Sequence, residues 1–564
     1  MKKTLRLLAI CGMAFTITTT VAWAGTANPK LSQELQALAA SGSTEVIIQY
    51  KTAPSTASFQ SVAAFGGMVH DTMPHVKAIH VTVPNFALPF LTSDPNLVFI
   101  TPNRKIHARF DQITDGTVHS DIANSAGHTG AGIGVAIIDS GVADLPDFYT
   151  GGTSRIVYSQ SFVGTEGGAD PNGNSPADEF GHGTHVAGIL AGNGNGTTYI
   201  GTVPQANIIN LRVLDLNGSG TDDSVIQAIE TAISLKSQYN IKVINLSLGR
   251  GVFESYTLDP LCQAVEAAYQ AGITVVVAAG NEGRDNSVGE EGYGTISAPG
   301  NDPFAITVGA INSNQTTDRS DDVMTSYSSK GPTLFDDVVK PDILAPGNQI
   351  VSTLPSGMTL FSEYPGNQVT GNYFTLSGTS MATPVVAGAA VIALENFPGM
   401  TPDQVKAALM TTASKNFPTS TTVVDSGVSY TDYYDIFTVG AGELDINALD
   451  AMTSLPPAGS AQSPVAVYNA ATGEVTLTGI SGSNVVWGAN VVWGANVVWG
   501  ANVVWGANVV WGANVVWGAN VVWGANAAEA LNVVWGANVV WGADVIFAQL
   551  ASQAESMAVI HGDK

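Results

Sequence analysis

Four polar residues, far apart in the sequence, could together carry out nucleophilic catalysis. Ser380 offers a hydroxyl group, which is a weak nucleophile near neutral pH unless a base lies within hydrogen-bond reach. His182 suits that role because the unperturbed pKa of an imidazole is about 6.5, and a carboxylate such as Asp139 can fix its tautomer and stabilise the imidazolium. Asn281 offers an amide donor to a developing oxyanion. The four together predict acyl transfer through a serine.

Each of these residues also has a purely structural explanation. Asp139 could be a turn residue, His182 the N-terminal residue of a helix, and Asn281 a loop residue. Ser380 lies among small residues and could simply begin a tightly packed helix. Their joint occurrence, with one residue for each catalytic role, favours the catalytic interpretation.

Two of the four follow segments with the composition of buried strands. Asp139 comes directly after residues 134–138, and Asn281 shortly after residues 274–278. Near-continuous β-branched runs of this kind indicate strands that are buried on both faces. Further strands are predicted at 207–211, 242–246 and 305–308, and helices at 222–234 and 261–270. This alternation predicts an α/β fold with a doubly wound, mainly parallel sheet, whose sites form beyond the carboxyl ends of the strands.

The other two lie at predicted helix starts. His182 opens an Ala- and Gly-rich segment, and Ser380 precedes the apolar run 385–391. A helix start presents free backbone N–H groups and the positive end of the helix dipole. Both features favour a nucleophile whose product carries negative charge on a neighbouring oxygen.

Three segments that contain these residues resemble the signatures of the subtilisin-like serine peptidases, namely 136–141, 182–188 and 378–384. The chain order Asp, His, Ser also agrees with that family. The resemblance implies a subtilisin-like fold in which Ser380 attacks the scissile carbonyl and His182 shuttles the proton. It implies that Asp139 orients His182, and that the Asn281 amide and the Ser380 N–H bind the oxyanion. The second histidine of the motif, His185, is expected to be structural.

The same resemblance implies a binding cleft for an extended polypeptide. Two segments match those that pair with substrate in the family, and a third would line the pocket for the residue before the scissile bond. They are Ser247-Leu248-Gly249, Gly218-Ser219-Gly220 after Asn217, and Ala278-Ala279-Gly280. The small residues of Ala278-Ala279-Gly280 leave room in this pocket for a large substrate side chain. Glu282 at the rim of the pocket could tolerate a basic one.

No cofactor is required by this chemistry, and no metal ligand is assigned. Many members of the family bind Ca²⁺, and the loop 191–196 follows the His182 helix, where the family often has a calcium site. Asn195 could contribute one oxygen, but no matching set of carboxylates is present. Turn-forming Asn-Gly pairs explain the loop equally well.

Six segments are predicted along the chain. Residues 1–24 read as a signal peptide with a basic start and an apolar stretch, too short and too broken for a transmembrane anchor, so the protein is expected to be secreted, extracellular or attached to the cell surface. Residues 25–115 resemble the family's inhibitory α+β propeptide, with strands at 44–50, 78–83 and 97–100 and a helix near 58–65. A zymogen that cleaves itself between about His107 and Val118 is therefore expected. The remaining segments are the peptidase domain (116–452), a linker that can form a hairpin (453–483), a repeat module (484–550) and a tail (551–564).

The repeat module consists of the hexapeptide Asn-Val-Val-Trp-Gly-Ala, which recurs from Asn484 onward. Because the period is even, every Trp would face the same side of an extended chain. Short Val-Val-Trp strands joined by Gly-Ala-Asn turns are therefore expected, stacked as a β-solenoid. The alternative is an adhesive surface that binds a polymer or the cell envelope.

Composition limits the partners and leaves a second function class open. A net charge of −25, from 21 basic and 46 acidic residues, argues against nucleic acid and anionic membranes. Polypeptide substrates and the chain's own propeptide are the expected partners. The alternative to a secreted endopeptidase is a catalytically inert surface or adhesion protein that uses the Trp repeats.

Overall fold

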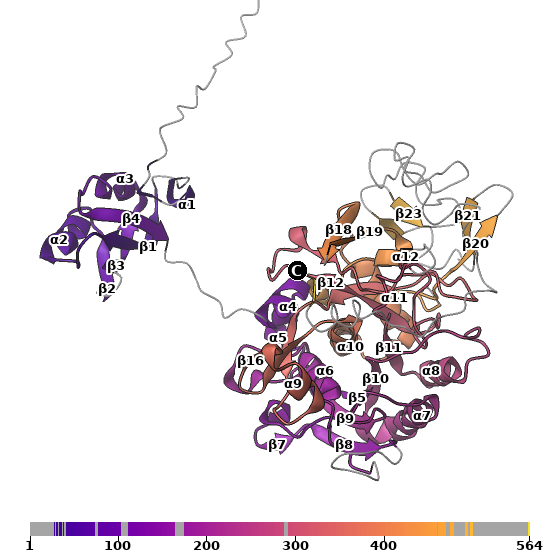
Figure 1. The fold of residues 1–564 in the computed structure, drawn as a ribbon. Helices are drawn as coiled ribbons and strands as arrows, with labels where there is room; N and C mark the ends of the chain where they lie inside the picture. The colour runs from indigo at the N-terminus through magenta and orange to yellow at the C-terminus, as the bar shows by residue number, and fades with distance from the viewer. Residues whose placement is uncertain are drawn as a thin grey trace, which may run out of the picture. The chain divides into compact units, whose positions relative to one another are not determined.

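The computed structural model describes residues 28, 30–31, 33–36, 38, 41–73, 77–102, 111–163, 174–286, 291–425, 427–459, 461–469, 474–478, 491–493, 497–499 and 562–563. The chain divides into two compact units, Met1–His107 and Ala108–Lys564, which Figure 1 shows as ribbons. The predicted signal peptide lies outside the described residues.

The N-terminal unit is a four-stranded antiparallel sheet in the order β2-β3-β1-β4. The three predicted strands and the predicted helix are present, and β2 is an additional edge strand. Alternate residues of the central strands, such as Val46, Ile48 and Val81, are fully buried in the core of this unit. Its elements are α1 (Gln33–Gln36), β1 (Ser43–Tyr50), α2 (Thr56–Ala64), β2 (Met68–Met73), β3 (Ala78–Pro84), α3 (Leu88–Leu91) and β4 (Leu97–Pro102).

The large unit is built on an eight-stranded sheet in the order β13-β12-β11-β10-β5-β9-β8, with β14 also paired to β12. All neighbouring pairs are parallel except β12 with β13. The mainly parallel sheet with flanking helices confirms the α/β fold predicted for this part of the chain. The strands of this sheet are β5 (Gly134–Asp139), β8 (Ile156–Ser161), β9 (Asn207–Arg212), β10 (Ile241–Leu246), β11 (Thr274–Ala278), β12 (Ile306–Asn312), β13 (Val323–Met324) and β14 (Ile343–Pro346).

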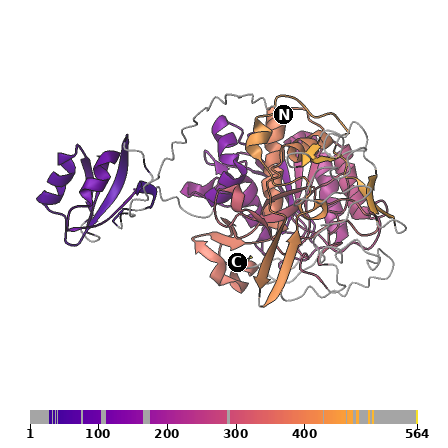
Figure 2. The ribbon, with the colours of Figure 1, turned by 90° about the horizontal axis from the view of Figure 1, so that it is seen from above.

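Helices cover both faces of this sheet, as the view from above in Figure 2 shows. Successive strand residues point to opposite faces, so Val135 and Ile137 pack with one set of helices while Ala136 and Ile138 pack with another. The first face carries α6 (His182–Ala191) and α10 (Thr379–Asn396), and the second carries α7 (Asp222–Tyr239) and α8 (Pro260–Gln270). The two helices whose starts carry candidate residues therefore lie on the same face.

The other elements of the large unit surround this layered core. The helices are α4 (Asp111–Val118), α5 (Ser120–Ala126), α9 (Thr359–Glu363), α11 (Pro402–Thr412), α12 (Ile436–Val439) and α13 (Ile446–Asp450). The strands are β6 (Tyr149–Thr150), β7 (Thr153–Ser154), β15 (Ile350–Thr353), β16 (Gln368–Thr370), β17 (Tyr373–Leu376), β18 (Ser420–Asp425), β19 (Val428–Tyr433), β20 (Val465–Asn469) and β21 (Glu474–Thr478). Helix α4, which spans the predicted boundary at 115/116, packs on β14 and β15.

The stretch predicted to be a linker is attached to the large unit. Ser463 is 4% exposed and its hydroxyl donates to Asp342 at 2.6 Å, while Lys406 Nζ donates to Ser463 at 2.8 Å. The main chain of Ala466 donates to Asp337 O at 2.8 Å. The hairpin expected in this stretch is present as β20 and β21.

Only two hexapeptide repeats contain described strands, β22 (Val491–Trp493) and β23 (Val497–Trp499). They agree with the expected Val-Val-Trp strands, but they pair antiparallel, with Val492 opposite Val498. Only three residues separate them in the sequence, and so short a connection joins antiparallel rather than parallel neighbours. β22 and β23 therefore pair as the strands of a hairpin and not as neighbouring coils of the expected solenoid.

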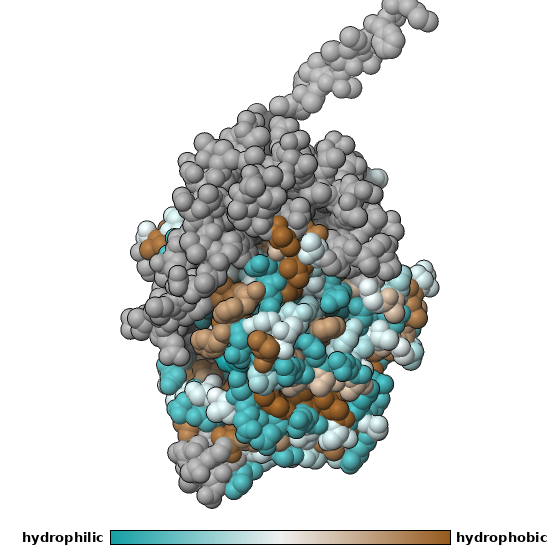
Figure 3. All heavy atoms as spheres, turned by 90° about the vertical axis from the view of Figure 1, so that its right-hand side faces the viewer, coloured by the Kyte–Doolittle hydropathy of each residue, from teal (hydrophilic) through white to brown (hydrophobic). Residues whose placement is uncertain are grey.

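The described surface on the face shown in Figure 3 mixes hydrophilic and hydrophobic residues, with the hydrophobic ones in separate patches. Within the described ranges, none of the helices combines the length and the apolar character needed to cross a membrane.

Candidate functional site

Asp139 and His182 meet at the carboxyl edge of the central sheet. Asp139 is the last residue of β5 and is fully buried, and His182 is the first residue of α6. His182 Nδ1 lies 2.8 Å from Asp139 Oδ1, which leaves Nε2 as the nitrogen for a proton transfer. Burial alone would lower the pKa of His182, but the charge and hydrogen bond of Asp139 outweigh it, so the pKa is raised.

A close approach between α6 and β5 makes this pair possible. A Cβ atom on Gly183 would lie 2.2 Å from the carbonyl oxygen of Gly141 and 3.1 Å from Asp139. Only a residue without a side chain fits there, so the glycine after His182 lets the helix start press against the end of the strand.

Asp178 holds the start of α6, and the sequence analysis did not identify it. Its Oδ1 accepts hydrogen bonds from Gly181 N at 2.7 Å and from the Ser140 hydroxyl at 2.9 Å, and its Oδ2 accepts from Thr184 N at 2.8 Å and from the Thr184 hydroxyl at 2.6 Å. Burial raises the pKa of Asp178, and these donors oppose the rise. A carboxylate shortly before a helix start is a general capping signal, which could have pointed to it.

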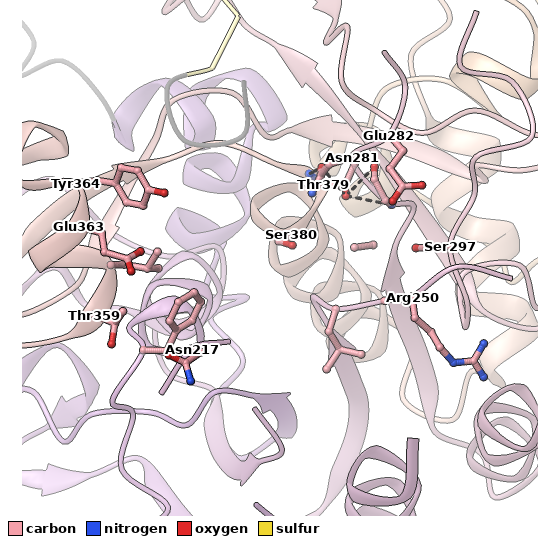
Figure 4. Close-up of a pocket in the computed structure, with 16 residues that line it drawn as sticks. Asn217, Arg250, Asn281, Glu282, Ser297, Thr359, Glu363, Tyr364, Thr379 and Ser380 are labelled. Carbon is pink, nitrogen blue, oxygen red and sulfur yellow. Dashed lines mark hydrogen bonds between the residues drawn. The ribbon is translucent and has the colours of Figure 1, made fainter. Parts of the chain in front are cut away.

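Ser380 is the second residue of α10, and its side chain faces a cleft (Figure 4). Its hydroxyl donates to the carbonyl oxygen of Ser247 at 3.1 Å, while the Ser247 hydroxyl donates to the carbonyl oxygen of Ser380 at 2.8 Å. No hydrogen bond joins Ser380 to His182 in the described part of the chain, and catalytic hydrogen bonds are often long in enzymes without substrate.

Asn281 lies beside the start of α10, and hydrogen bonds fix the orientation of its side chain. Its Oδ1 accepts from Thr379 N at 2.8 Å and from the Thr379 hydroxyl at 3.1 Å, contacts that Figure 4 marks with dashed lines. Because the oxygen is engaged, the amide nitrogen is the end that remains to donate to a ligand.

The cleft encloses about 480 Å³ and is lined by residues from several loops. Of the predicted subsite residues, Leu248, Gly249, Ala278 and Gly280 line it, whereas Ser247, Ala279, Gly218, Ser219 and Gly220 are not among the lining residues. Asn217 lines the cleft next to the last three of these. Lining residues that the sequence analysis did not name are Phe180, Arg250, Ser297, Thr359, Leu360, Glu363 and Tyr364.

Gly218 and Ser219 belong to a tight turn beside the cleft. Gly218 N donates to Asp215 O at 3.0 Å, and Ser219 N donates to Asp215 Oδ1 at 2.9 Å. The Phe180 ring packs so closely on Gly218 that a Cβ there would lie 2.5 Å from it. Phe180, which packs on Gly218, itself lines the cleft.

The labelled side chains of the cleft lie on two sides of Ser380 (Figure 4). Asn217, Thr359, Glu363 and Tyr364 lie on one side of Ser380, and Ser297, Arg250 and Glu282 lie on the other. Glu282 is exposed at the rim of the cleft. Partial desolvation by surrounding atoms raises the pKa of its carboxyl group, and the nearby negative charge of Asp285 adds to the rise.

His185 is turned into the core. It is fully buried, its Nε2 lies 2.9 Å from the carbonyl oxygen of Phe374, and burial lowers its pKa to about 3. A histidine that stays neutral and bonds to the main chain has a structural role, as expected.

The loop near Asn195, considered above as a possible calcium site, makes several hydrogen bonds within the protein. Asn193 Oδ1 accepts from Asn195 N at 2.8 Å, and the Tyr373 hydroxyl donates to Gly194 O at 2.9 Å and to the buried Asp147 carboxylate. These contacts agree with the alternative explanation of the loop, a turn built on Asn-Gly pairs. Among the described residues, the one grouping of three or more His, Cys, Asp or Glu side chains that could share an ion is Glu45, His70 and His80, in the N-terminal unit.

Comparison with known proteins gives consistent matches. The profile of the Subtilase family matches residues 130–432. Serine protease AprX of Bacillus subtilis (strain 168) is 37% identical over 331 residues, which cover 57% of this chain and 70% of that protein. Subtilisin E of the same organism is 34% identical over 352 residues, 62% of this chain and 78% of its own. Subtilisin of Bacillus pumilus is 38% identical over 293 residues, 52% of this chain and 87% of its own.

Proposed function

This chain belongs to the subtilase family and is a serine-type endopeptidase, and we propose that Ser380, His182 and Asp139 form its catalytic triad. The observation that carries this assignment is the 2.8 Å contact between His182 Nδ1 and Asp139 Oδ1. It leaves the opposite nitrogen of the ring for the serine, which begins α10 on the same face of the sheet.

The first half of the reaction forms an acyl-enzyme. The Ser380 hydroxyl leaves Ser247 O and hydrogen-bonds to His182 Nε2, which takes its proton as Oγ attacks the scissile carbonyl. Asp139 stabilises the resulting imidazolium. The Asn281 amide and the Ser380 N–H donate to the oxyanion, and the positive end of the α10 dipole favours the same charge. His182 then gives its proton to the leaving amine, and the peptide C–N bond breaks.

The second half releases the acyl group. Water enters the place of the amine and gives a proton to His182 as its oxygen attacks the ester carbonyl. The same oxyanion donors act again, and the proton returns from His182 to Ser380 Oγ as the ester C–O bond breaks. The free carboxylic acid leaves, and the enzyme is restored.

The substrate in this proposal is an extended polypeptide that lies between two main-chain segments, Leu248–Gly249 and Gly218–Gly220. Ala278 and Gly280 line the cleft and Ala279 lies between them in sequence, so a large side chain fits before the scissile bond. Glu282 at the rim would favour a basic side chain in the same pocket.

We further propose that residues 25–115 act as an inhibitory propeptide that the enzyme removes itself. Cleavage falls between about His107 and Val118. Because Thr117 and Val118 are buried in the large unit and belong to α4, a bond near the start of this range is the favoured target. Ser380→Ala protein should accumulate uncleaved, and normal processing of that variant would reject self-cleavage.

Secretion follows in this proposal from the signal-like residues 1–24. The N-terminal sequence and intact mass of the protein recovered from the culture medium would reveal the signal and propeptide cleavage sites. Protein found only inside the cell would contradict secretion.

The alternative proposal is an inert surface protein that adheres through the Trp repeats. Casein hydrolysis that a serine-directed phosphonate blocks would reject it. If the processed protein hydrolysed no casein, the proposed catalytic function would fall instead, and binding to cell-envelope polymers would then be the property to measure.

A further inference from the structure

The last described residues, Gly562 and Asp563, occupy a buried pocket of the large unit. The Asp563 side chain is 2% exposed. Its Oδ1 accepts from Arg284 Nη2 at 2.7 Å and from the Ser326 hydroxyl at 2.8 Å, and its Oδ2 accepts from Ser326 N at 2.6 Å. Both carboxylate oxygens are therefore satisfied by donors of the peptidase fold.

Arg284 is buried at this site and makes further hydrogen bonds there. Its side chain is 2% exposed, its Nε donates to the Ser326 hydroxyl at 2.7 Å, and its Nη1 donates to Asp425 at 2.8 Å. The ring of Tyr430 lies 4.5 Å from the guanidinium carbon. A buried cation needs anionic partners, and Asp425, which is 46% exposed, is the more hydrated of the two. Asp563 thus supplies the buried half of the charge balance.

The main chain around Asp563 is also bound. Asp563 N donates to Asn348 Oδ1 at 2.8 Å, and Asn348 Nδ2 donates to Asp563 O at 3.1 Å. This two-way pairing resembles one rung of an antiparallel ladder and fixes the direction of the bound segment.

The residue before Asp563 must be glycine. Gly562 has φ +74°, a conformation that side chains disfavour, and a Cβ there would lie 2.5 Å from Asn348 Oδ1 and 2.7 Å from the Ser377 hydroxyl. The pocket therefore selects a Gly-Asp pair by shape at one residue and by charge at the next.

We propose that Arg284, Ser326 and Asn348 form a carboxylate-binding pocket whose ligand is the chain's own Gly562–Asp563. The predicted linker that precedes the repeats is attached to the same unit through β20, where Ala466 N donates to Asp337 O. The pocket binds the described residues that follow the repeats, so the repeat region is tethered to the large unit on both sides. A cut within the repeats then leaves the far fragment bound.

The test is a single cut within the repeat region of the full-length chain. Residues 527–532, the hexapeptide that lacks Trp, are replaced by the recognition sequence of a site-specific protease in a Ser380→Ala background. Activity plays no part in the readout, so failure of the proposed catalytic mechanism cannot be mistaken for failure of this proposal. After the cut, size-exclusion chromatography and mass spectrometry show whether the fragment beginning at residue 533 stays with the rest.

Three variants of the cut protein decide the outcome. Asp563→Asn removes the charge, and Gly562→Ala keeps the charge but collides with Asn348 and Ser377. Both should release the fragment at least about tenfold faster than the parent, which corresponds to about 1.4 kcal/mol. Glu555→Gln, which removes a charge from the same stretch of sequence, should retain it. Loss of the parent fragment, or equal retention in Asp563→Asn and Gly562→Ala, would overturn the proposal.

Discussion

Ser247 and Ser380 hold each other by a reciprocal pair of hydrogen bonds. The Ser247 hydroxyl donates to Ser380 O at 2.8 Å, and the Ser380 hydroxyl donates to Ser247 O at 3.1 Å. The first bond has a sequence cause. In an α-helix the carbonyl of residue 380 would accept from the N–H of residue 384, but Pro384 has none. Ser247 supplies the missing donor and connects the proposed substrate-binding segment to the start of α10.

We predict that Ser247→Ala lowers kcat by about 5–30-fold, because the Ser380 carbonyl loses its donor at a cost of about 1–2 kcal/mol. KM should change less, since the side chain of Ser247 does not line the cleft. Steady-state kinetics on a soluble peptide ester would measure the split.

The double variant Ser247→Ala with Pro384→Ala provides the control. Replacing the proline restores a main-chain N–H that can bond to Ser380 O within the helix, so the double variant should lose less activity than the product of the single losses. Independent, multiplicative effects would contradict the role given to Ser247.

The acidic limb of the activity profile should report His182. Only the neutral imidazole accepts the proton, and Asp139 raises the pKa of His182 despite burial. Activity should therefore fall as pH decreases, with a midpoint above about 6.5. Asp139→Asn removes the two largest influences that raise this pKa and leaves burial and the smaller effect of the Asp178 charge. The midpoint should therefore move to lower pH while kcat falls by about 10⁴-fold, as in another serine-protease triad. A profile of kcat/KM against pH with an unmoved midpoint would exclude His182 as the titrating base.

Stability should respond to pH in the opposite sense at the same pair. A folded-state pKa raised above the unfolded value contributes stability that is complete below about pH 6.5 and is lost as pH rises through the folded pKa. His182→Gln should remove this contribution. Thermal unfolding of Ser380→Ala and of Ser380→Ala/His182→Gln across that pH range would measure how the stability of each variant depends on pH. The same dependence in both variants would contradict this prediction.

Asp178 should be a positioning residue for His182. Asp178→Asn keeps the size of the side chain, but the amide nitrogen cannot accept a hydrogen bond, so the bonds from Gly181 and from Thr184 cannot all be kept. We therefore expect a loss of about 1–3 kcal/mol in unfolding free energy. The apparent pKa of the acidic limb should shift too, because the start of α6 carries His182. Asp144→Asn, at an exposed partner of Tyr149, is the matched control; equal effects in both variants would reject the assignment.

Glu282 should tune the preference before the scissile bond. Glu282→Gln should lower kcat/KM for substrates with Lys or Arg at that position by about 3–10-fold relative to Leu, as expected for a partly solvated charge pair. Competition between paired peptides would measure the ratio, and an unchanged ratio would show that the carboxylate does not face the pocket.

The sequence was informative where one local pattern serves one role. The buried strand runs predicted the central sheet, and residues at strand ends and helix starts predicted the Asp139–His182 contact, because parallel strands bring their carboxyl ends to one edge. The edge strands β2 and β8 have weak periodicity and were not predicted. Phe180 and Tyr364 line the cleft through tertiary packing that no local pattern encodes.

Polar contacts between residues far apart in the sequence were also not predicted. The partners of Asp563 lie at residues 284, 326 and 348, and nothing in a Gly-Asp pair near the end of the sequence indicates burial. The antiparallel pairing of β22 and β23 was also not predicted. A period of six fixes the side of the strand on which each Trp lies, but the direction of pairing depends on the length of the connection between the strands.

The most direct test of the catalytic assignment is to locate the residue that a serine-directed phosphonate modifies. We predict one phosphonate per processed chain, on the peptide that contains Ser380, with labelling abolished in Ser380→Ala and strongly slowed in His182→Ala. Label on any other serine, or casein hydrolysis that persists in Ser380→Ala, would contradict it.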